Sequence, residues 1–142
     1  MVKQFLRLFT LVASIVIFFD QLTKFLINWF QPQLQWGLIA IHVTQNTGAG
    51  FGILQGKTIG LAVVSLFIAL VVIFNYDRIA KEKSAQILFA LFLGGVVGNF
   101  IDRLFRGYVI DFIDIGFWPT FNIADAAITV SAFGLLIYYW KK

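Results

Sequence analysis

Four of the chain's seven acidic residues lie close together near its C-terminal end, in a sequence that is otherwise strongly apolar. They are Asp102, Asp111, Asp114 and Asp125. Carboxylates held against lipid are costly and usually have a functional role. When two carboxyl groups share a site they cannot both ionise easily, so one keeps its proton. Such a pair can activate water with one member and polarise a peptide carbonyl with the other, which predicts an aspartyl hydrolase.

The residue pattern alone does not rank Asp111 above Asp114 or Asp102 as the partner of Asp125. Asp111 lies in the apolar run Val-Ile-Asp-Phe-Ile, where burial and a second carboxylate would both raise its pKa. Asp125 has a structural interpretation as well, because Asn122 followed three residues later by an acid resembles a capping box that opens a helix. The helix dipole would favour an ionised carboxylate there, and it could decide which member of the pair carries the charge.

The composition identifies an integral membrane protein. Of the 142 residues 60% are hydrophobic and only 13% are charged, against about 25% in soluble domains, and the mean hydropathy is +0.87. The absence of Cys excludes disulfides and thiolate sites, and a single His excludes a multi-His metal site, so no metal or cofactor is expected. Membrane topology explains the net charge of +4 without a nucleic-acid partner.

Four apolar runs predict four membrane spans, each near the 20 residues that cross a bilayer. The N-terminus resembles a signal peptide, because Lys3 and Arg7 precede the first run. Asp20 and Lys24 interrupt that run instead of a small-residue cleavage site, so we expect a retained first span. The prediction is one membrane domain over 1–142, with spans at about 8–27, 58–74, 85–104 and 123–140 and outer segments at 28–57 and 105–122.

The basic residues divide unevenly between the two sides of the membrane. Seven flank one side and four the other, which predicts that both termini are cytoplasmic. Five acids fall at or toward the outer side, so the site should face outward near the interface. The seven basic residues are Lys3, Arg7, Arg78, Lys81, Lys83, Lys141 and Lys142, and the four are Lys24, Lys57, Arg103 and Arg106.

The two outer segments contain strand-like patterns. Residues 39–44 alternate between apolar and smaller or polar side chains, and turn chemistry follows in Asn46-Thr-Gly-Ala-Gly. Residues 108–115 offer a second extended piece, and Pro119 makes a continuous helix across that segment unfavourable. We therefore expect a mainly α membrane protein with four transmembrane helices and a small extracytoplasmic β-sheet.

Several polar residues can be interpreted as either structural or functional. Asp20 and Lys24 are four apart and can pair on one helix face; we expect Lys24 to snorkel outward and Asp20 to have a functional role. Asn46 is expected in a structural turn, with binding of substrate backbone as the alternative. Asn99, Asp102 and Arg103 form either an ion-pair network or part of a substrate site. Gly94 and Gly98 are spaced for close helix–helix approach.

Four stretches together resemble signal peptidase II, the bacterial lipoprotein signal peptidase family. They are Asp20-Gln-Leu-Thr-Lys24; Asn46-Thr-Gly-Ala-Gly-Phe51; Gly98-Asn-Phe-Ile-Asp-Arg103 continuing to Gly107-Tyr-Val-Ile-Asp-Phe112; and Phe121-Asn-Ile-Ala-Asp125. Each is weak alone, but their order and spacing together are specific and span nearly the whole chain. One small departure is Gly50, where the family more often has Ala.

The resemblance implies that Asp111 and Asp125 are the catalytic pair of an intramembrane aspartyl endopeptidase. It implies a prolipoprotein substrate, cut just before a Cys that carries diacylglycerol, in the bacterial inner membrane among its lipids. We expect a monomer without metal or cofactor. The residues with implied supporting or substrate-binding roles are Asp20, Lys24, Asn46, Gly48, Asn99, Asp102, Arg103, Asn122 and Ala124.

Two other classes of protein fit part of the pattern. A small transporter or proton-relay subunit would also carry intramembrane acids, but its acids should be distributed through the depth of the bilayer. A non-catalytic scaffold would need no paired carboxylates and should tolerate Asp→Asn at both positions.

Overall fold

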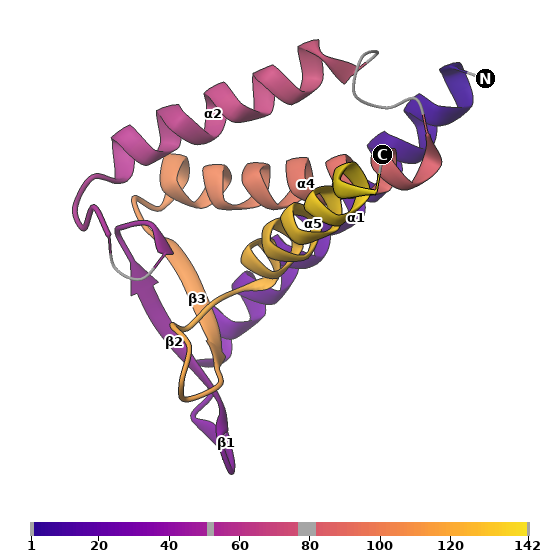
Figure 1. Cartoon of the computed structure of the whole chain (residues 1–142). Helices are drawn as coiled ribbons and strands as arrows, with labels where there is room; N and C mark the ends of the chain where they lie inside the picture. The colour runs from indigo at the N-terminus through magenta and orange to yellow at the C-terminus, as the bar shows by residue number, and fades with distance from the viewer. Residues whose placement is uncertain (1, 51–52, 77–81, 142) are drawn as a thin grey trace.

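The structure is a computed structural model that describes residues 2–50, 53–76 and 82–141 (Figure 1). Four helices and a small antiparallel sheet make up this part of the chain. Phe51, the last residue of the second family-like stretch, and the basic residues Arg78, Lys81 and Lys142 lie outside the described residues. The elements are α1 (Val2–Phe30), β1 (Leu34–Trp36), β2 (Ile39–Asn46), α2 (Thr58–Phe74), α4 (Lys83–Phe105), β3 (Val109–Asp114) and α5 (Ile123–Trp140).

Three of the helices, α1 from Leu6, α4 and α5, are long and apolar enough to cross a membrane. The fourth, α2, is equally apolar but has 17 residues. Most of its large side chains are exposed, Phe67 at 66% among them, as expected for a helix whose solvent is lipid. The helices and the sheet confirm the expected fold class. α1 and α4 extend beyond the expected spans 8–27 and 85–104 at both ends.

α4 is the central helix, and it contacts α1, α2 and α5. Glycines make this possible, because a Cβ at Gly94 would lie 2.7 Å from the Cβ of Val16 on α1. A Cβ at Gly98 would lie 2.6 Å from Oδ2 of Asp20. The expected close approach of helices at Gly94 and Gly98 is thus confirmed, with α1 as the partner.

The sheet has the strand order β1-β2-β3, and both pairs are antiparallel. A register shift between Ile41 and Thr44 places Thr44 opposite Asp111. Phe121 adds a short bridge to Ile113 on the other edge of β3, which brings the start of α5 beside that strand. Figure 1 shows the sheet at one end of the helices and both chain termini at the opposite end.

We predict that Gly95→Ala lowers the thermal unfolding temperature of the detergent-solubilised protein. The added Cβ would lie 2.5 Å from the Ala124 carbonyl oxygen on α5, which is backbone and cannot turn away. Overpacking of this kind costs about 1–3 kcal/mol. Gly60→Ala on α2 is the matched control, because nothing apart from its chain neighbours and its own helix backbone lies within 4 Å of its Cβ position. Equal unfolding temperatures for the two variants would contradict the packing described here.

Candidate active site

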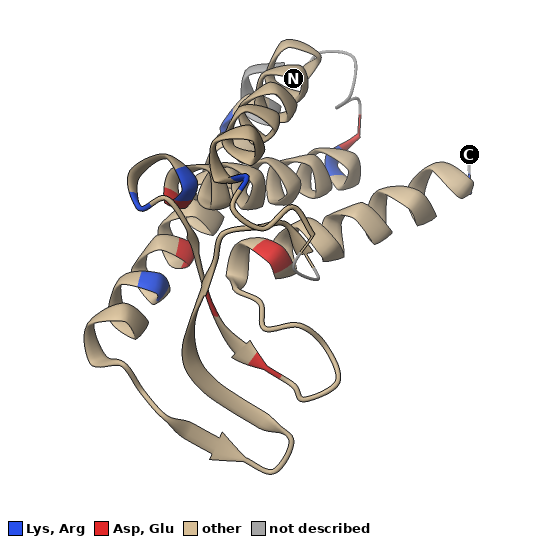
Figure 2. Ribbon diagram, turned by 90° about the vertical axis from the view of Figure 1, so that its left-hand side faces the viewer, with Lys and Arg blue, Asp and Glu red and all other residues tan. Residues whose placement is uncertain are grey.

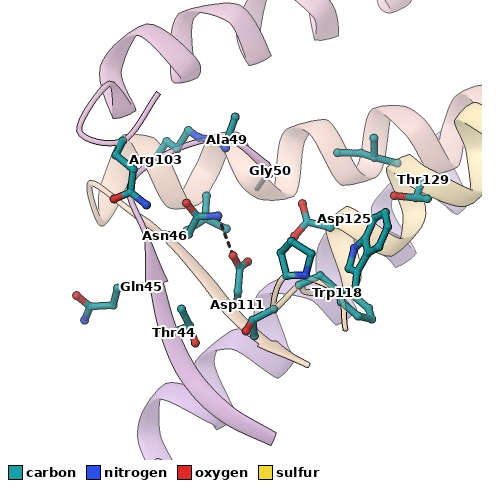
Figure 3. Close-up of a pocket in the computed structure, with 16 residues that line it drawn as sticks. Thr44, Gln45, Asn46, Ala49, Gly50, Arg103, Asp111, Trp118, Asp125 and Thr129 are labelled. Carbon is teal, nitrogen blue, oxygen red and sulfur yellow. Dashed lines mark hydrogen bonds between the residues drawn. The ribbon is translucent and has the colours of Figure 1, made fainter. Parts of the chain in front are cut away.

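One pocket of about 330 Å³ is lined by residues of β2, β3, α4, α5 and the segment before α5. Asp111 and Asp125 both lie on its wall, although they come from different elements (Figure 3). The other two candidate acids are engaged elsewhere. Asp114 accepts a hydrogen bond from the main-chain N–H of Gly116 at 2.7 Å, and Asp102 is fully buried in ion pairs. Of the four clustered acids, these two share the pocket.

Asp111 on β3 is only 2% exposed and accepts a hydrogen bond at each carboxyl oxygen. The side-chain amide of Asn46 donates to Oδ2 at 2.9 Å, and that of Asn122 donates to Oδ1 at 2.6 Å. Burial, and after it the charge of Asp125, raise the pKa of Asp111 to about 7, although the two amide hydrogen bonds and the charge of Lys24 oppose the rise. Asp111 is therefore suited to hold a proton near neutral pH.

Asp125 lies in the first turn of α5 and closes a capping box with Asn122. Its main-chain N–H donates to Oδ1 of Asn122 at 2.9 Å, and its own Oδ2 accepts the main-chain N–H of Asn122 at 3.3 Å. The capping box expected from the sequence is thus confirmed, and it coexists with a place on the pocket wall. Asn99 donates to the remaining oxygen, Oδ1, at 2.8 Å.

Neighbouring donors fix the orientation of each of the three amides around the two acids. Oδ1 of Asn46 accepts the main-chain N–H of Gly48, as Oδ1 of Asn122 accepts that of Asp125. Oδ1 of Asn99 accepts the ammonium of Lys24 at 3.0 Å. Because an amide has its oxygen on one side and its NH₂ on the other, all three NH₂ groups are directed at carboxylates.

A buried ion network lies directly behind the pocket. Lys24 is 0% exposed and bonds Asp20 at 2.8 Å and Asp102 at 2.9 Å. The expectation that Lys24 snorkels outward is wrong, because two carboxylates and the Asn99 oxygen hold its ammonium inside the protein. Asp20 also accepts the main-chain N–H of Ala124 at 2.9 Å, so the network ties α1 and α4 to the start of α5. In Figure 2 most of the Asp and Glu residues, in red, lie where the helices meet the sheet.

Sequence reasoning missed two members of this network. Gln21 donates to Asp20 and Asp102 at 3.1 Å, and its oxygen accepts Arg106 at 3.1 Å. Arg106 also pairs with Asp102. The spacing of Asp102 and Arg106 by four residues is a helical pairing signal, whereas nothing in the sequence distinguishes Gln21 except its place beside Asp20.

Arg103 holds the segment that follows β2. Its Nη2 donates to the carbonyl oxygen of Gly48 at 3.2 Å, and its Nη1 approaches Oγ of Ser65 on α2 at 3.5 Å. A Cβ at Gly48 would lie 2.6 Å from the Ile53 carbonyl oxygen, so this turn needs a glycine. The turn begins directly after Asn46, the residue that donates a hydrogen bond to Asp111. Arg103 itself lines the pocket.

Comparisons with known proteins agree with this architecture. The family described as signal peptidase (SPase) II matches residues 12–141 of the chain. The lipoprotein signal peptidase of Moorella thermoacetica is 40% identical over 94% of this chain and 91% of its own length. That of Shouchella clausii is 42% identical over 84% of each chain. A solved bacterial membrane enzyme, determined by the in meso method, superposes with a TM-score of 0.82 at 30% identity, covering 92% of this chain and 86% of its own.

We predict that Lys24→Met strongly destabilises the protein. It leaves Asp20 and Asp102 buried without the cation they share, and breaking such a network costs about 3–5 kcal/mol. Thermal unfolding in detergent, with Lys57→Met as the control, measures the effect. The Lys57 side chain is exposed and makes no capping hydrogen bond to α2, so its loss should change little. An unfolding temperature of Lys24→Met equal to that of the native protein would show that the network is dispensable.

Proposed function

The chain belongs to the signal peptidase II family, and we propose that it hydrolyses its substrates with Asp111 and Asp125 as a pair of aspartyl catalysts. The observation that carries this proposal is that both carboxyl groups line the same pocket and accept hydrogen bonds from the same residue. Asn122 donates its side-chain amide to Asp111 and its main-chain N–H to Asp125. The two acids also have different surroundings, which suits one acid and one base.

In the proposed mechanism Asp125 is the base and Asp111 is the acid. Asp125, at the positive N-terminal end of the α5 dipole, takes a proton from water as the water oxygen attacks the scissile carbonyl carbon. Asp111, whose pKa is about 7, donates its proton to the carbonyl oxygen, which yields a gem-diol. The C–N bond then breaks as Asp125 gives its proton to the amine nitrogen and one gem-diol hydroxyl gives its proton to Asp111, which leaves a carboxylic acid and returns the pair to its starting charge. The carboxyl groups alone supply this chemistry, and their titration belongs to the pair.

Membership of the family makes the protein a membrane protease that removes signal peptides from prolipoproteins. We further propose that it cuts just before a diacylglyceryl-modified Cys. The site lies at one end of three long apolar helices, so the lipid tails of such a substrate can remain in the bilayer while the peptide bond reaches the acids. Asn46 and Arg103, at the polar end of the pocket, would position the substrate backbone.

The same reasoning leads to the orientation that we propose for the protein in the bacterial inner membrane. Both termini lie at the end of the bundle opposite the sheet (Figure 1). Together with the excess of basic residues on the terminal side, this supports cytoplasmic termini and an active site at the outer face. We propose that the chain acts as a monomeric single domain in the lipid bilayer, without cofactor or nucleic acid.

We predict that Asp111→Asn and Asp125→Asn each abolish cleavage of a lipidated precursor while the protein stays folded and inserted. Each substitution removes one of the two proton-transfer groups. Purified protein in detergent with EDTA present gives the measurement, and Asp114→Asn is the matched control because Asn can still accept the Gly116 N–H. Native turnover in either variant would remove that residue from the pair, and loss of native cleavage on addition of EDTA would remove the metal-free mechanism.

We predict that kcat/KM for cleavage falls as pH rises through about 7, the pKa of Asp111. The raised pKa keeps Asp111 protonated, and able to donate, below that pH, and ionisation above it removes the acid. Rates between pH 5.5 and 9 with a substrate that has no titrating group in this range test the assignment. Activity that increases from pH 7 to 9 would mean that Asp111 does not act as the proton donor.

A further inference from the structure

One exposed threonine on the pocket wall differs from the other threonines of the described helices, Thr10, Thr23 and Thr58, whose hydroxyls all donate a hydrogen bond. Thr129 on α5 lines the same pocket as the two acids, but it makes no hydrogen bond to any of the described residues. Thr10 and Thr23 on α1 donate to carbonyl oxygens one turn earlier, at 2.6 and 2.7 Å. Such bonds are the usual way to satisfy a hydroxyl in a membrane helix. Thr129 is therefore open to a ligand.

The wall around Thr129 is apolar. Trp118, Pro119, Phe121 and Ile128 line the pocket with it, and Trp118 is 47% exposed. Thr120, between Pro119 and Phe121, adds a second hydroxyl to this lining. Figure 3 shows Thr129 and Trp118 together on one side of the pocket, with Arg103 on the other. A ligand for this wall should thus be largely apolar and should carry an acceptor for a hydroxyl donor.

The position of Thr129 along α5 gives the direction in which this ligand extends. Thr129 follows Asp125 by four residues, and a helix rises 1.5 Å per residue, so it lies roughly 6 Å further along α5. α5 runs from the sheet end of the molecule toward the C-terminus (Figure 1). Because this is the direction into the bilayer, the wall lies on the lipid side of the acids.

The proposed substrate offers a group of this chemistry at this depth. A diacylglyceryl Cys carries two ester carbonyls on the side chain of the residue that follows the scissile bond, and the acyl chains extend from them. A signal-peptide helix offers fewer free acceptors to the Thr129 hydroxyl, because its backbone carbonyls are already hydrogen-bonded within the helix. The ester carbonyl of a bilayer phospholipid has the same chemistry, so the experiment must separate the two sources.

We propose that Thr129 donates a hydrogen bond to an ester carbonyl of the substrate's diacylglyceryl group, and that Trp118 and Ile128 pack against the adjoining glycerol and methylenes. This wall then contributes to selection of the lipid-modified precursor. The inference rests on the proposed function, since it assumes that the lipidated residue follows the bond cut by Asp111 and Asp125.

The test compares two lipopeptides whose Cys carries either a diacyl (ester) or a dialkyl (ether) glyceryl group, in a maltoside detergent free of ester lipid. The native protein should cleave the ester substrate with kcat/KM about 3–10-fold above the ether substrate, the worth of one hydrogen bond. Thr129→Val, which removes the hydroxyl with little change of shape, should lose that preference and cleave the ether substrate at the native rate. Thr129→Ser should keep the preference.

Thr10→Val is the matched control, because its hydroxyl bonds only its own helix, and it should behave as the native protein does. Equal loss on both substrates in Thr129→Val would indicate packing alone and overturn the proposal, as would a native protein that does not distinguish them. A preference that persists in Thr129→Val would overturn it too. If added ester phospholipid abolishes the native preference, the hydroxyl binds bilayer lipid instead. Failure of the native protein to cleave either lipopeptide would reject the proposed function itself.

Discussion

The structure depends on one buried cation. The ammonium of Lys24 lies between Asp20 and Asp102 with no exposure, and it also donates to Asn99. Burying a charge is tolerable only when its partners are in place, so these side chains constrain one another. Since Asp20 also accepts the Ala124 N–H, the same constraint sets how α1, α4 and the first turn of α5 meet.

The orientation of the amides around the pocket follows from that constraint. Asn99 accepts Lys24 with its oxygen and therefore presents its NH₂ to Asp125. Asn122 accepts a main-chain N–H in the capping box and presents its NH₂ to Asp111. A helix cap and an ion pair, both ordinary structural devices, thus give the two carboxyl groups different surroundings. The proposed mechanism needs this difference, because it assigns an acid and a base to one pocket.

Much of the fold could be predicted from the sequence because membrane helices are determined mainly by local composition. The apolar runs ending at Phe74 and Trp140 predict the ends of α2 and α5, and the spacing of Gly94 and Gly98 predicts a close contact. The strand pattern at 39–44 predicts β2. These signals survive in the sequence because lipid requires long apolar runs, and close backbone approach requires small residues.

The sequence by itself determined the class of protein, the concentration of acids near the C-terminal end and, through four short stretches together, the resemblance to a family. It did not determine which acids share a pocket, since Asp102, Asp111 and Asp114 are equally plausible partners of Asp125 in one dimension. Only the tertiary structure separated them, because it buries Asp102 against Lys24 and turns Asp114 toward its own loop. It also reversed the expectation for Lys24. The pairing of Lys24 with Asp20 is visible in the sequence, but the other two partners that hold its ammonium inside the protein, Asp102 and Asn99, come from a distant helix.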